Sequence, residues 1–224
     1  MTNEVKKAII TGASNGIGRS LTEKLLNEGV HVIAVTRSGK IEDYSHPNLT
    51  IVQGDISDEA SINRAIRQIG QITDQVDYLI NNAGVGPDLG QVIPTAEHLT
   101  TSFAVNSTGT VLFTEGALAY LKDGAHVVFL STAMALLRNA APDGPAYRMS
   151  KAAINMYAVI LSQRLAEKNI KVTPLHPGWV QTRMGGDSAP VTIEQSINGI
   201  YKALTQNTET GKFWNTNIDG IEEY

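Results

Sequence analysis

The sequence of 224 residues contains no cysteine. Disulfide bonds, thiolate catalysis and cysteine metal ligands are therefore excluded together. The sequence also has no run of 18 apolar residues, and its N-terminal stretch lacks the apolar core of a signal peptide, so we expect a cytoplasmic protein without a membrane contact. The five histidines show none of the paired spacings that bind metals, such as H-E-x-x-H, and we expect no metal site.

An excess of either charge is missing as well. Eighteen Lys and Arg residues stand against 22 Asp and Glu residues, and the net charge of −4 gives no electrostatic reason to expect nucleic acid as a partner. Hydrophobic residues make up 42% of the chain and charged residues 18%, which are globular values. Because no linker, repeat or low-complexity tract divides the chain, we predict one domain over residues 1–224.

Short apolar runs alternate with helical patterns along the chain. The runs that predict strands lie at residues 5–11, 30–36, 49–53, 76–80, 125–130 and 170–176, with a seventh at 212–215. The patterns that predict helices lie at residues 17–28, 57–70, 99–120, 146–168 and 193–204. This alternation predicts an α/β fold, a doubly wound parallel sheet of about seven strands with helices on both faces. Ser57 is the expected N-cap of the second helix.

A glycine-rich turn follows the first predicted strand. Gly12 can form a tight turn, Gly16 lets the backbone approach an anion, and Gly18 lets the next helix pack closely on the strand. A helix that begins there directs free N–H groups at the loop and suits a pyrophosphate. Taken alone, the G-x-x-x-G-x-G spacing is equally consistent with an ordinary structural turn.

The end of the second strand bears on the choice of dinucleotide. An acidic residue that binds the ribose 2′-hydroxyl is expected about 20 residues past such glycines, but Thr36 and Arg37 lie there instead. An arginine can pair with a 2′-phosphate, which favours NADP over NAD; the alternative is a solvated arginine in a turn. Asp55, at the end of the third strand, is expected either to contact the adenine or only to shape its turn.

Two of the predicted helices carry unusual residues. Tyr147 and Lys151 are four residues apart and share one helix face. Asn106 and Gly109 are costly inside a helix and predict a bend with a local purpose. The helix at 146–168 is apolar on almost every face, so we expect it to be buried in the core or to pair with a second copy in a homodimer.

Together these residues resemble the short-chain dehydrogenase/reductase family over essentially the whole chain. The motifs that carry the resemblance, in the family's order, are Thr11-Gly12-x-x-x-Gly16-x-Gly18, Asn81-Asn82-Ala83-Gly84, Asn106, Tyr147-x-x-x-Lys151 and Pro177-Gly178-x-x-x-Thr182. The stretches around Tyr147 and Pro177 look most like the carbonyl-reductase-like C-factor and Sniffer branch. The resemblance implies a Rossmann domain.

The implied activity is hydride transfer between NADP, or NAD, and a small carbonyl or alcohol substrate. Tyr147 would be the general acid, and a phenol needs a nearby cation such as Lys151 to lower its pKa. The resemblance further implies that Lys151 holds the nicotinamide ribose and that Asn106 anchors a water in a proton relay. The residues expected to contact the cofactor are Gly12, Ser14, Asn15, Gly16, Ile17, Gly18, Arg37, Asp55, Ile56, Asn82, Ala83, Gly84, Tyr147, Lys151, Pro177, Gly178, Val180 and Thr182.

One position departs from the family's pattern. The substrate-positioning serine of the family falls on Thr132, with Ser131 just before it, and either hydroxyl could serve. The segment 183–191 leaves room only for a small lid, whose glycines are expected to be mobile. Both features leave a second function open, a non-catalytic sensor or signalling module that binds a dinucleotide.

Overall fold

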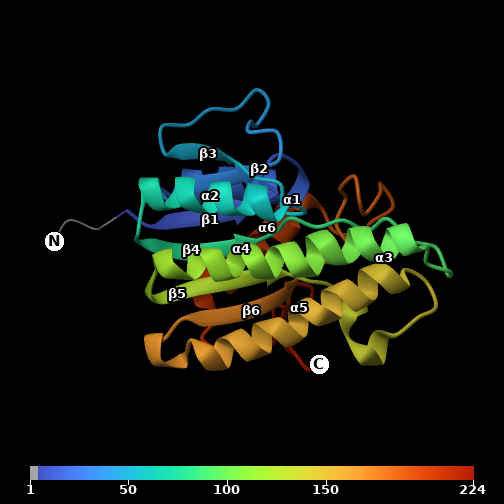
Figure 1. Cartoon of the computed structure of the whole chain (residues 1–224). Helices are drawn as coiled ribbons and strands as arrows, with labels where there is room; N and C mark the ends of the chain where they lie inside the picture. Colours follow the sequence, from blue (N-terminus) through green and yellow to red (C-terminus); the bar gives the residue numbers. More distant parts are fainter. Residues whose placement is uncertain (1–4) are drawn as a thin grey trace.

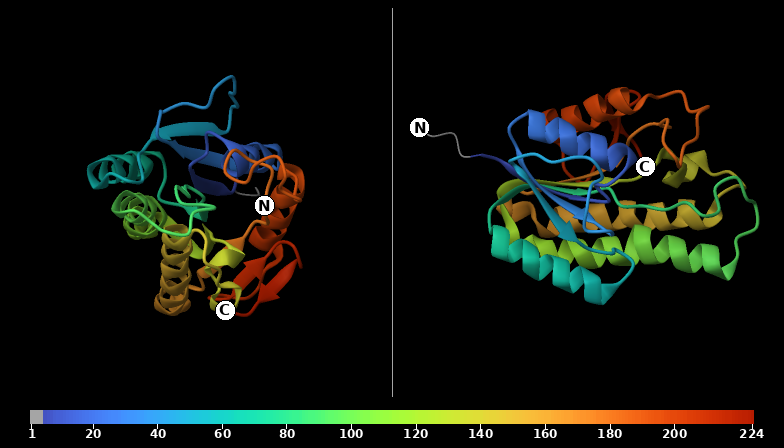
Figure 2. Two further views of the ribbon diagram at one scale, coloured as in Figure 1. Left: turned by 90° about the vertical axis from the view of Figure 1, so that its right-hand side faces the viewer. Right: turned by 90° about the horizontal axis from the view of Figure 1, so that it is seen from above.

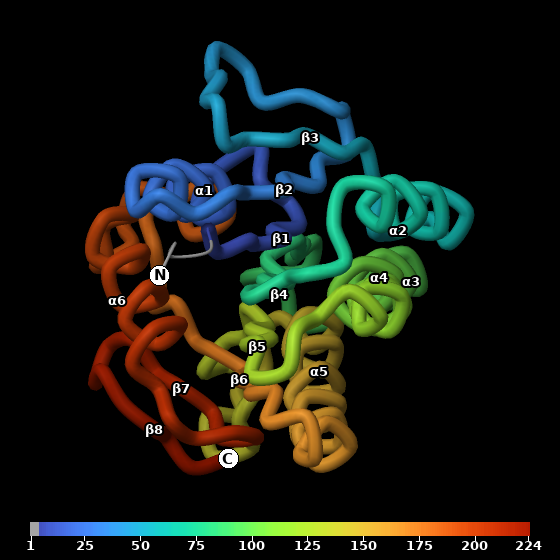
Figure 3. The backbone as a smooth tube through the Cα atoms, turned by 90° about the vertical axis from the view of Figure 1, so that its left-hand side faces the viewer, coloured from blue at the N-terminus to red at the C-terminus, as the bar shows by residue number. Residues whose placement is uncertain are grey.

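The computed structural model describes residues 5–224; the first four residues of the predicted 1–224 domain lie outside this range. Its strands are β1 Lys7–Thr11, β2 His31–Thr36, β3 Leu49–Gln53, β4 Val76–Asn81, β5 Leu121–Leu130, β6 Lys171–His176, β7 Phe213–Asn215 and β8 Gly220–Glu222. Within the described residues they form one eight-stranded sheet in the order β3-β2-β1-β4-β5-β6-β7-β8 (Figure 3). The pairs from β3 to β7 are parallel, which confirms the predicted sheet, and β8 adds an antiparallel strand at its edge.

Helices cover both faces of the sheet (Figures 2 and 3). On one face lie α1 Gly16–Asn27 and α6 Ile193–Gln206; on the other lie α2 Glu59–Ile72, α4 Thr110–Ala117 and α5 Pro145–Arg164. α3 Ala96–Phe103 continues into α4 through η1 Ala104–Gly109. Single 3₁₀ turns are η2 Leu118–Tyr120, η3 Ala133–Ala135, η4 Leu137–Asn139 and η5 Ala166–Lys168.

The sheet separates two hydrophobic clusters. Ile9, Ile33 and Leu79 pack with α2, α4 and α5, whereas Ile10 and Ile80 pack with α1 and α6. Neighbouring residues of one strand thus contribute to both clusters. This is why the central strands are continuous apolar runs rather than alternating ones.

The helix predicted at 99–120 has the expected irregularity at Asn106 and Gly109. Residues 104–109 form a π-helical turn between α3 and α4. A Cβ at Gly109 would lie 1.7 Å from the carbonyl oxygen of Ile56, so only glycine allows this turn to pack against the segment between β3 and α2. The irregular turn therefore allows the backbone at Gly109 to lie directly against the backbone of Ile56.

Two of the predicted boundaries that differ from the structure have a clear physical reason. Asp58, not Ser57, caps α2, because its carboxylate accepts hydrogen bonds from the N–H groups of Ala60 at 3.2 Å and Ser61 at 3.1 Å. Ser57 instead donates to Asp55 Oδ1 at 2.6 Å. β5 begins four residues earlier than predicted, because Lys122, Asp123 and Gly124 interrupt the apolar pattern by which a strand is recognised.

A search of residues 5–224 for a membrane-spanning helix, judged by length and hydropathy, finds none.

Candidate active site

Strands β1, β4, β5 and β6 are parallel, and the loops that follow them meet at one edge of the sheet, on the right in Figure 1. α1 and α5 both begin at this edge. In open α/β sheets ligands bind at the carboxyl ends of the strands. The edge therefore brings together the glycine turn, the Asn82–Gly84 segment and the start of the helix that carries Tyr147.

The glycine turn packs directly against the loop after β4. Gly12 has a φ of +65°, and a Cβ there would lie 2.9 Å from the Cα of Ala83. A Cβ on Gly18 would lie 2.4 Å from Asn82 Nδ2. This amide nitrogen donates to the carbonyl oxygens of Thr11 at 2.9 Å and Gly12 at 3.1 Å. Side chains at either glycine would separate these two loops.

The start of α1 suits an anion. The Asn15 side chain makes no capping hydrogen bond to α1 and instead donates to Ser14 Oγ at 3.2 Å. The N–H groups of the first turn, including that of Ile17, thus keep free positions beside a glycine, Gly16, whose φ is +51°. The uncapped N–H groups and the bare backbone at Gly16 fit a pyrophosphate.

Arg37 and Asp55 lie at the ends of neighbouring strands, β2 and β3. Arg37 is exposed. Hydrogen bonds from Ser57, at 2.6 and 2.9 Å, lower the pKa of Asp55 most, and the positive charge of Arg37 lowers it further. Asp55 thus accepts hydrogen bonds within its own turn, a contact with the adenine stays a prediction, and Ile56 beside it is buried.

Tyr147 and Lys151 are both buried on the sheet side of α5, with 8% and 5% of their surface exposed. The Thr132 hydroxyl lies near enough to the Tyr147 phenol to lower its pKa slightly, and Lys151 Nζ donates to the carbonyl oxygen of Leu130 at 2.7 Å. Burial raises the pKa of Tyr147 to about 12 and lowers the pKa of Lys151 to about 8. The expectation that Lys151 lowers the phenol pKa is not met, because burial dominates both groups.

The two hydroxyls at the end of β5 point to different partners. Ser131 Oγ donates to Asn155 Oδ1 at 2.6 Å, inside the protein. Thr132 contacts Tyr147 and accepts a hydrogen bond from the N–H of Met134 at 3.2 Å. Of the pair, Thr132 is the residue that the fold brings to the phenol.

Asn106 joins the π-helical turn to the loop after β4. Its Oδ1 accepts from the N–H of Val85 at 2.8 Å, and its Nδ2 donates to the carbonyl oxygen of Val85 at 2.7 Å and to Ser150 Oγ at 3.0 Å. Both amide N–H groups are thus engaged by the protein. The predicted water of a proton relay would have to contact another atom of this residue.

Backbone pairing joins the two ends of the segment after β6. Gly178 takes a φ of +89°, and Val180 forms a bridge with Val191, supported by the hydrogen bond from Gln181 N–H to the Val191 carbonyl at 2.9 Å. Within this segment Thr182 reaches the glycine turn, since a Cβ on Gly16 would lie 3.5 Å from Thr182 Cγ2. The residues of this segment that the sequence predicts near the cofactor, Pro177, Gly178, Val180 and Thr182, therefore lie between β6 and that turn.

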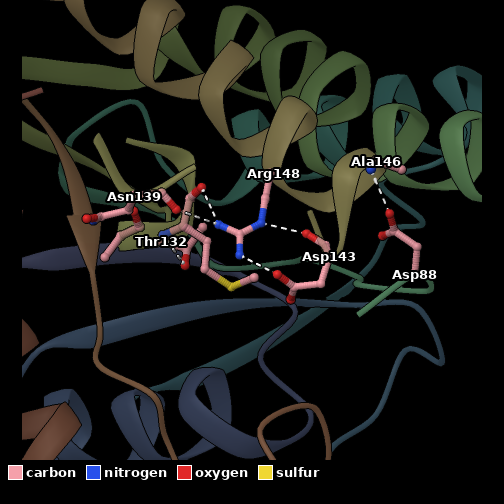
Figure 4. A network of polar contacts seen from close by, with 8 residues as sticks. Asp88, Thr132, Asn139, Asp143, Ala146 and Arg148 are labelled. Carbon is pink, nitrogen blue, oxygen red and sulfur yellow. Dashed lines mark hydrogen bonds and ion pairs between the residues drawn. The ribbon is translucent and has the colours of Figure 1, made fainter. Parts of the chain in front are cut away.

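Two residues at the site were not predicted from the sequence, Asp88 and Arg148 (Figure 4). Asp88 accepts hydrogen bonds from the first turn of α5, and Arg148 donates to Asp143 and to the carbonyl oxygens of Met134 and Asn139. The Gly144-Pro145 start of α5 offers no capping side chain of its own, and this signal in the sequence could have indicated that a residue such as Asp88 is needed.

The described residues contain no cluster of His, Asp or Glu that could hold a metal ion.

Comparison with known proteins agrees with this geometry. A family model described as short chain dehydrogenase matches residues 6–191. The NADPH-bound carbonyl reductase from chicken fatty liver has a similar structure, with 28% identity, a TM-score of 0.89 and coverage of 99% of this chain and 100% of that chain. The carbonyl reductase Sniffer of D. melanogaster gives 26% identity, a TM-score of 0.89 and coverage of 98% and 99%.

A third similar protein is named for a signal and not for a reductase activity. The C-signal of Myxococcus xanthus is 37% identical over 138 residues, which cover 59% of this chain and 82% of that protein. The family model matches most of the chain, and the fold agrees with that of carbonyl reductases over nearly its whole length. The protein therefore belongs to the short-chain dehydrogenase/reductase family of oxidoreductases, and its resemblance is to the carbonyl-reductase-like branch.

Proposed function

We propose that the protein reduces aldehydes or ketones with NADPH, or runs the reverse oxidation of the alcohol. The observation that carries this proposal is the buried contact between Thr132 and Tyr147, one helical turn from Lys151 and at the same edge as the glycine turn. A binding module without chemistry has no need to bury a phenol and an amine side by side, because burying ionisable groups costs stability.

Three side chains, those of Thr132, Tyr147 and Lys151, have different roles at the carbonyl oxygen of the substrate. A bound nicotinamide supplies the hydride. Thr132 and Tyr147 donate hydrogen bonds to the oxygen, which stabilises the negative charge that develops there. Tyr147 then transfers its proton to this oxygen. A phenol with a pKa of about 12 is protonated at neutral pH, and Lys151, with a pKa of about 8, is still a cation that can stabilise the resulting phenolate.

The proposed cofactor site runs along the same edge. The N–H groups at the start of α1 would bind the pyrophosphate, while Asn82, Ala83 and Gly84 would line the adenosine side and Thr182 the carboxamide. Arg37 would pair with the 2′-phosphate of NADP, since it is exposed directly after β2. The similar carbonyl reductase from chicken fatty liver, which is NADPH-bound, supports this choice over NAD.

A homodimer through α5 is part of the same proposal. One face of this helix is buried, but the opposite face exposes Met149, Met156 and Ile160, and Leu112 is exposed on α4. Apolar side chains gathered on two helices are typical of subunit contacts. Sedimentation at micromolar concentration tests this, with a dimer expected; a monomer alone would contradict it.

The second candidate function is that of a sensor or signalling module. The similarity to a protein named C-signal favours it over other non-enzymatic functions. Such a module would bind the dinucleotide and transmit its state without turnover. The buried Tyr147 and Lys151 pair favours the reductase instead.

One experiment separates the two functions. The purified protein is incubated with NADPH and a panel of aldehydes, ketones and quinones, and the loss of nicotinamide absorbance is followed. The reductase predicts turnover with at least one class of carbonyl compound. Saturable NADPH binding without turnover across the panel would favour the sensor.

A further inference from the structure

The helix that carries Tyr147 begins without a cap of its own. Gly144 occupies the N-cap position with a φ of +62°, and glycine has no side chain that could accept a hydrogen bond. Pro145 follows as the first helical residue and has no N–H group. The N–H groups of Ala146 and Tyr147 thus depend on an acceptor from elsewhere in the chain.

Asp88 supplies both acceptors. This residue lies in the loop after β4, 59 positions before Tyr147. Its Oδ2 accepts from the N–H of Ala146 at 2.6 Å (Figure 4). Its Oδ1 accepts from the N–H of Tyr147 at 3.1 Å. Asp88 is completely buried. A buried carboxylate is costly unless its charge is compensated, and here the N-terminal N–H groups of α5 compensate it.

The loop around Asp88 also contacts the ring of Tyr147. A Cβ on Gly86 would lie 3.4 Å from Tyr147 Cδ2, and the N–H of Gly144 donates to the carbonyl oxygen of Gln91 at 2.8 Å. The backbone of Tyr147 is therefore held by Asp88 while its ring packs beside the same loop. This loop follows directly on the Asn82–Gly84 segment that packs against the glycine turn.

We propose that Asp88 is a positioning residue for Tyr147. By fixing the N–H of this residue, it sets where the phenol lies relative to Thr132 and to the loop after β4. The proposal rests on the proposed role of Tyr147 as the proton donor. Arg148 holds the other flank, the segment after Thr132, through hydrogen bonds to the carbonyl oxygens of Met134 and Asn139, both 3.1 Å.

The test compares Asp88→Asn with a matched control, Asp58→Asn. Asparagine retains one acceptor but places an NH₂ group against one of the two N–H donors. Asp58 caps α2 with the corresponding pair of hydrogen bonds in an exposed position, so its variant weakens the cap of a helix that does not carry Tyr147. For each variant kcat, the substrate KM, the Kd for NADPH and the Tm are measured.

We expect kcat of Asp88→Asn to fall roughly 10- to 100-fold, because a small displacement of a catalytic group has effects of this size. The Kd for NADPH should stay within about twofold, since the proposed pyrophosphate site is on α1. Asp58→Asn should lower the Tm and leave kcat at saturating NADPH unchanged. Equal kcat values in Asp88→Asn and the wild type would overturn the proposal, as would equal losses in both variants.

A second readout does not depend on turnover. The protein is labelled at the tyrosine ring carbons, and the Tyr147 signal among the seven tyrosines is identified by its loss in Tyr147→Phe. Asp88→Asn should shift the Tyr147 signal and Asp58→Asn should not; an unshifted signal in Asp88→Asn overturns the proposal. If Tyr147→Phe remains active, the proposed function fails by itself, whereas an inactive Tyr147→Phe beside a fully active Asp88→Asn refutes only the role of Asp88.

Discussion

Ser131 donates a hydrogen bond of 2.6 Å to Asn155 Oδ1, and both side chains are buried between β5 and α5. Ser131 is therefore occupied inside the protein, although it directly precedes the residue that contacts Tyr147. We therefore propose that the hydroxyl of Thr132, with its additional methyl group, takes the place of the family's serine at the site.

This difference predicts opposite effects for two substitutions. Thr132→Val keeps the shape but removes a donor to the carbonyl oxygen, and kcat should fall about 100-fold. Its loss of stability should be smaller than that of Ser131→Ala, because the Met134 N–H that loses its acceptor is only partly buried. Ser131→Ala leaves Asn155 Oδ1 without its donor and should lower the free energy of unfolding by about 1–3 kcal/mol. Its kcat should fall less than tenfold. Steady-state kinetics and urea unfolding of both variants check this, and the reverse pattern would place Ser131 at the substrate.

The preference for NADP depends on Arg37. Arg37→Ala should weaken NADPH binding by about 1.5–3 kcal/mol, as expected for a lost charged hydrogen bond, and should leave NADH binding nearly unchanged. Lys40→Ala is the control, because Lys40 lies in the same turn but pairs with Glu42 at 2.6 Å. Titration of nicotinamide fluorescence measures the dissociation constants of NADPH and NADH for the wild type and both variants. Equal weakening of NADPH and NADH by Arg37→Ala would mean that this arginine does not contact a phosphate.

Acid should destabilise the fold through His126. Its Nδ1 donates to the carbonyl oxygen of Leu204 at 3.1 Å, and its Nε2 hydrogen-bonds the hydroxyl of Thr173 at 2.8 Å, inside the protein. Burial lowers the pKa of His126 to about 4. The unfolded chain, with a pKa near 6.5, binds the proton first, so stability is complete above pH ~6.5 and is lost as the pH falls towards 4.

The expected loss between pH 7.5 and pH 5 is about 2 kcal/mol from this histidine. Urea unfolding at the two pH values measures it. His126→Asn, which keeps a donor near Leu204 but does not titrate, should be less stable at pH 7.5 and lose correspondingly less stability at pH 5. An unchanged pH dependence in that variant would remove His126 as the cause.

The central strands and the family motifs could be predicted from the sequence because their signals are local. β1, β2 and β4 each contain a short apolar run, and the glycines, Tyr147 and Lys151 stand at fixed spacings. β8 could not be predicted, since three residues carry no periodicity and the strand exists through its pairing with β7. The cap of α2 was misplaced by one residue because Ser57 and Asp58 both suit the position.

The features of the site that were missed depend on contacts across the chain. Asp88 lies in a loop, and nothing near it in the sequence indicates that a helix 59 positions later requires its carboxylate. The pKa of Tyr147 was expected to be lowered by Lys151, but the depth of burial that raises it to about 12 is set by the packing of α5 on the sheet. The Asp88 cap and the burial of Tyr147 both depend on tertiary structure, which the spacing of residues along the sequence does not indicate.

The most direct test of the account is Tyr147→Phe, measured for turnover of the best carbonyl substrate and for the Kd of NADPH. The substitution removes only the hydroxyl that contacts Thr132. The account predicts that turnover is abolished while NADPH binding changes little. Full turnover by Tyr147→Phe would contradict it.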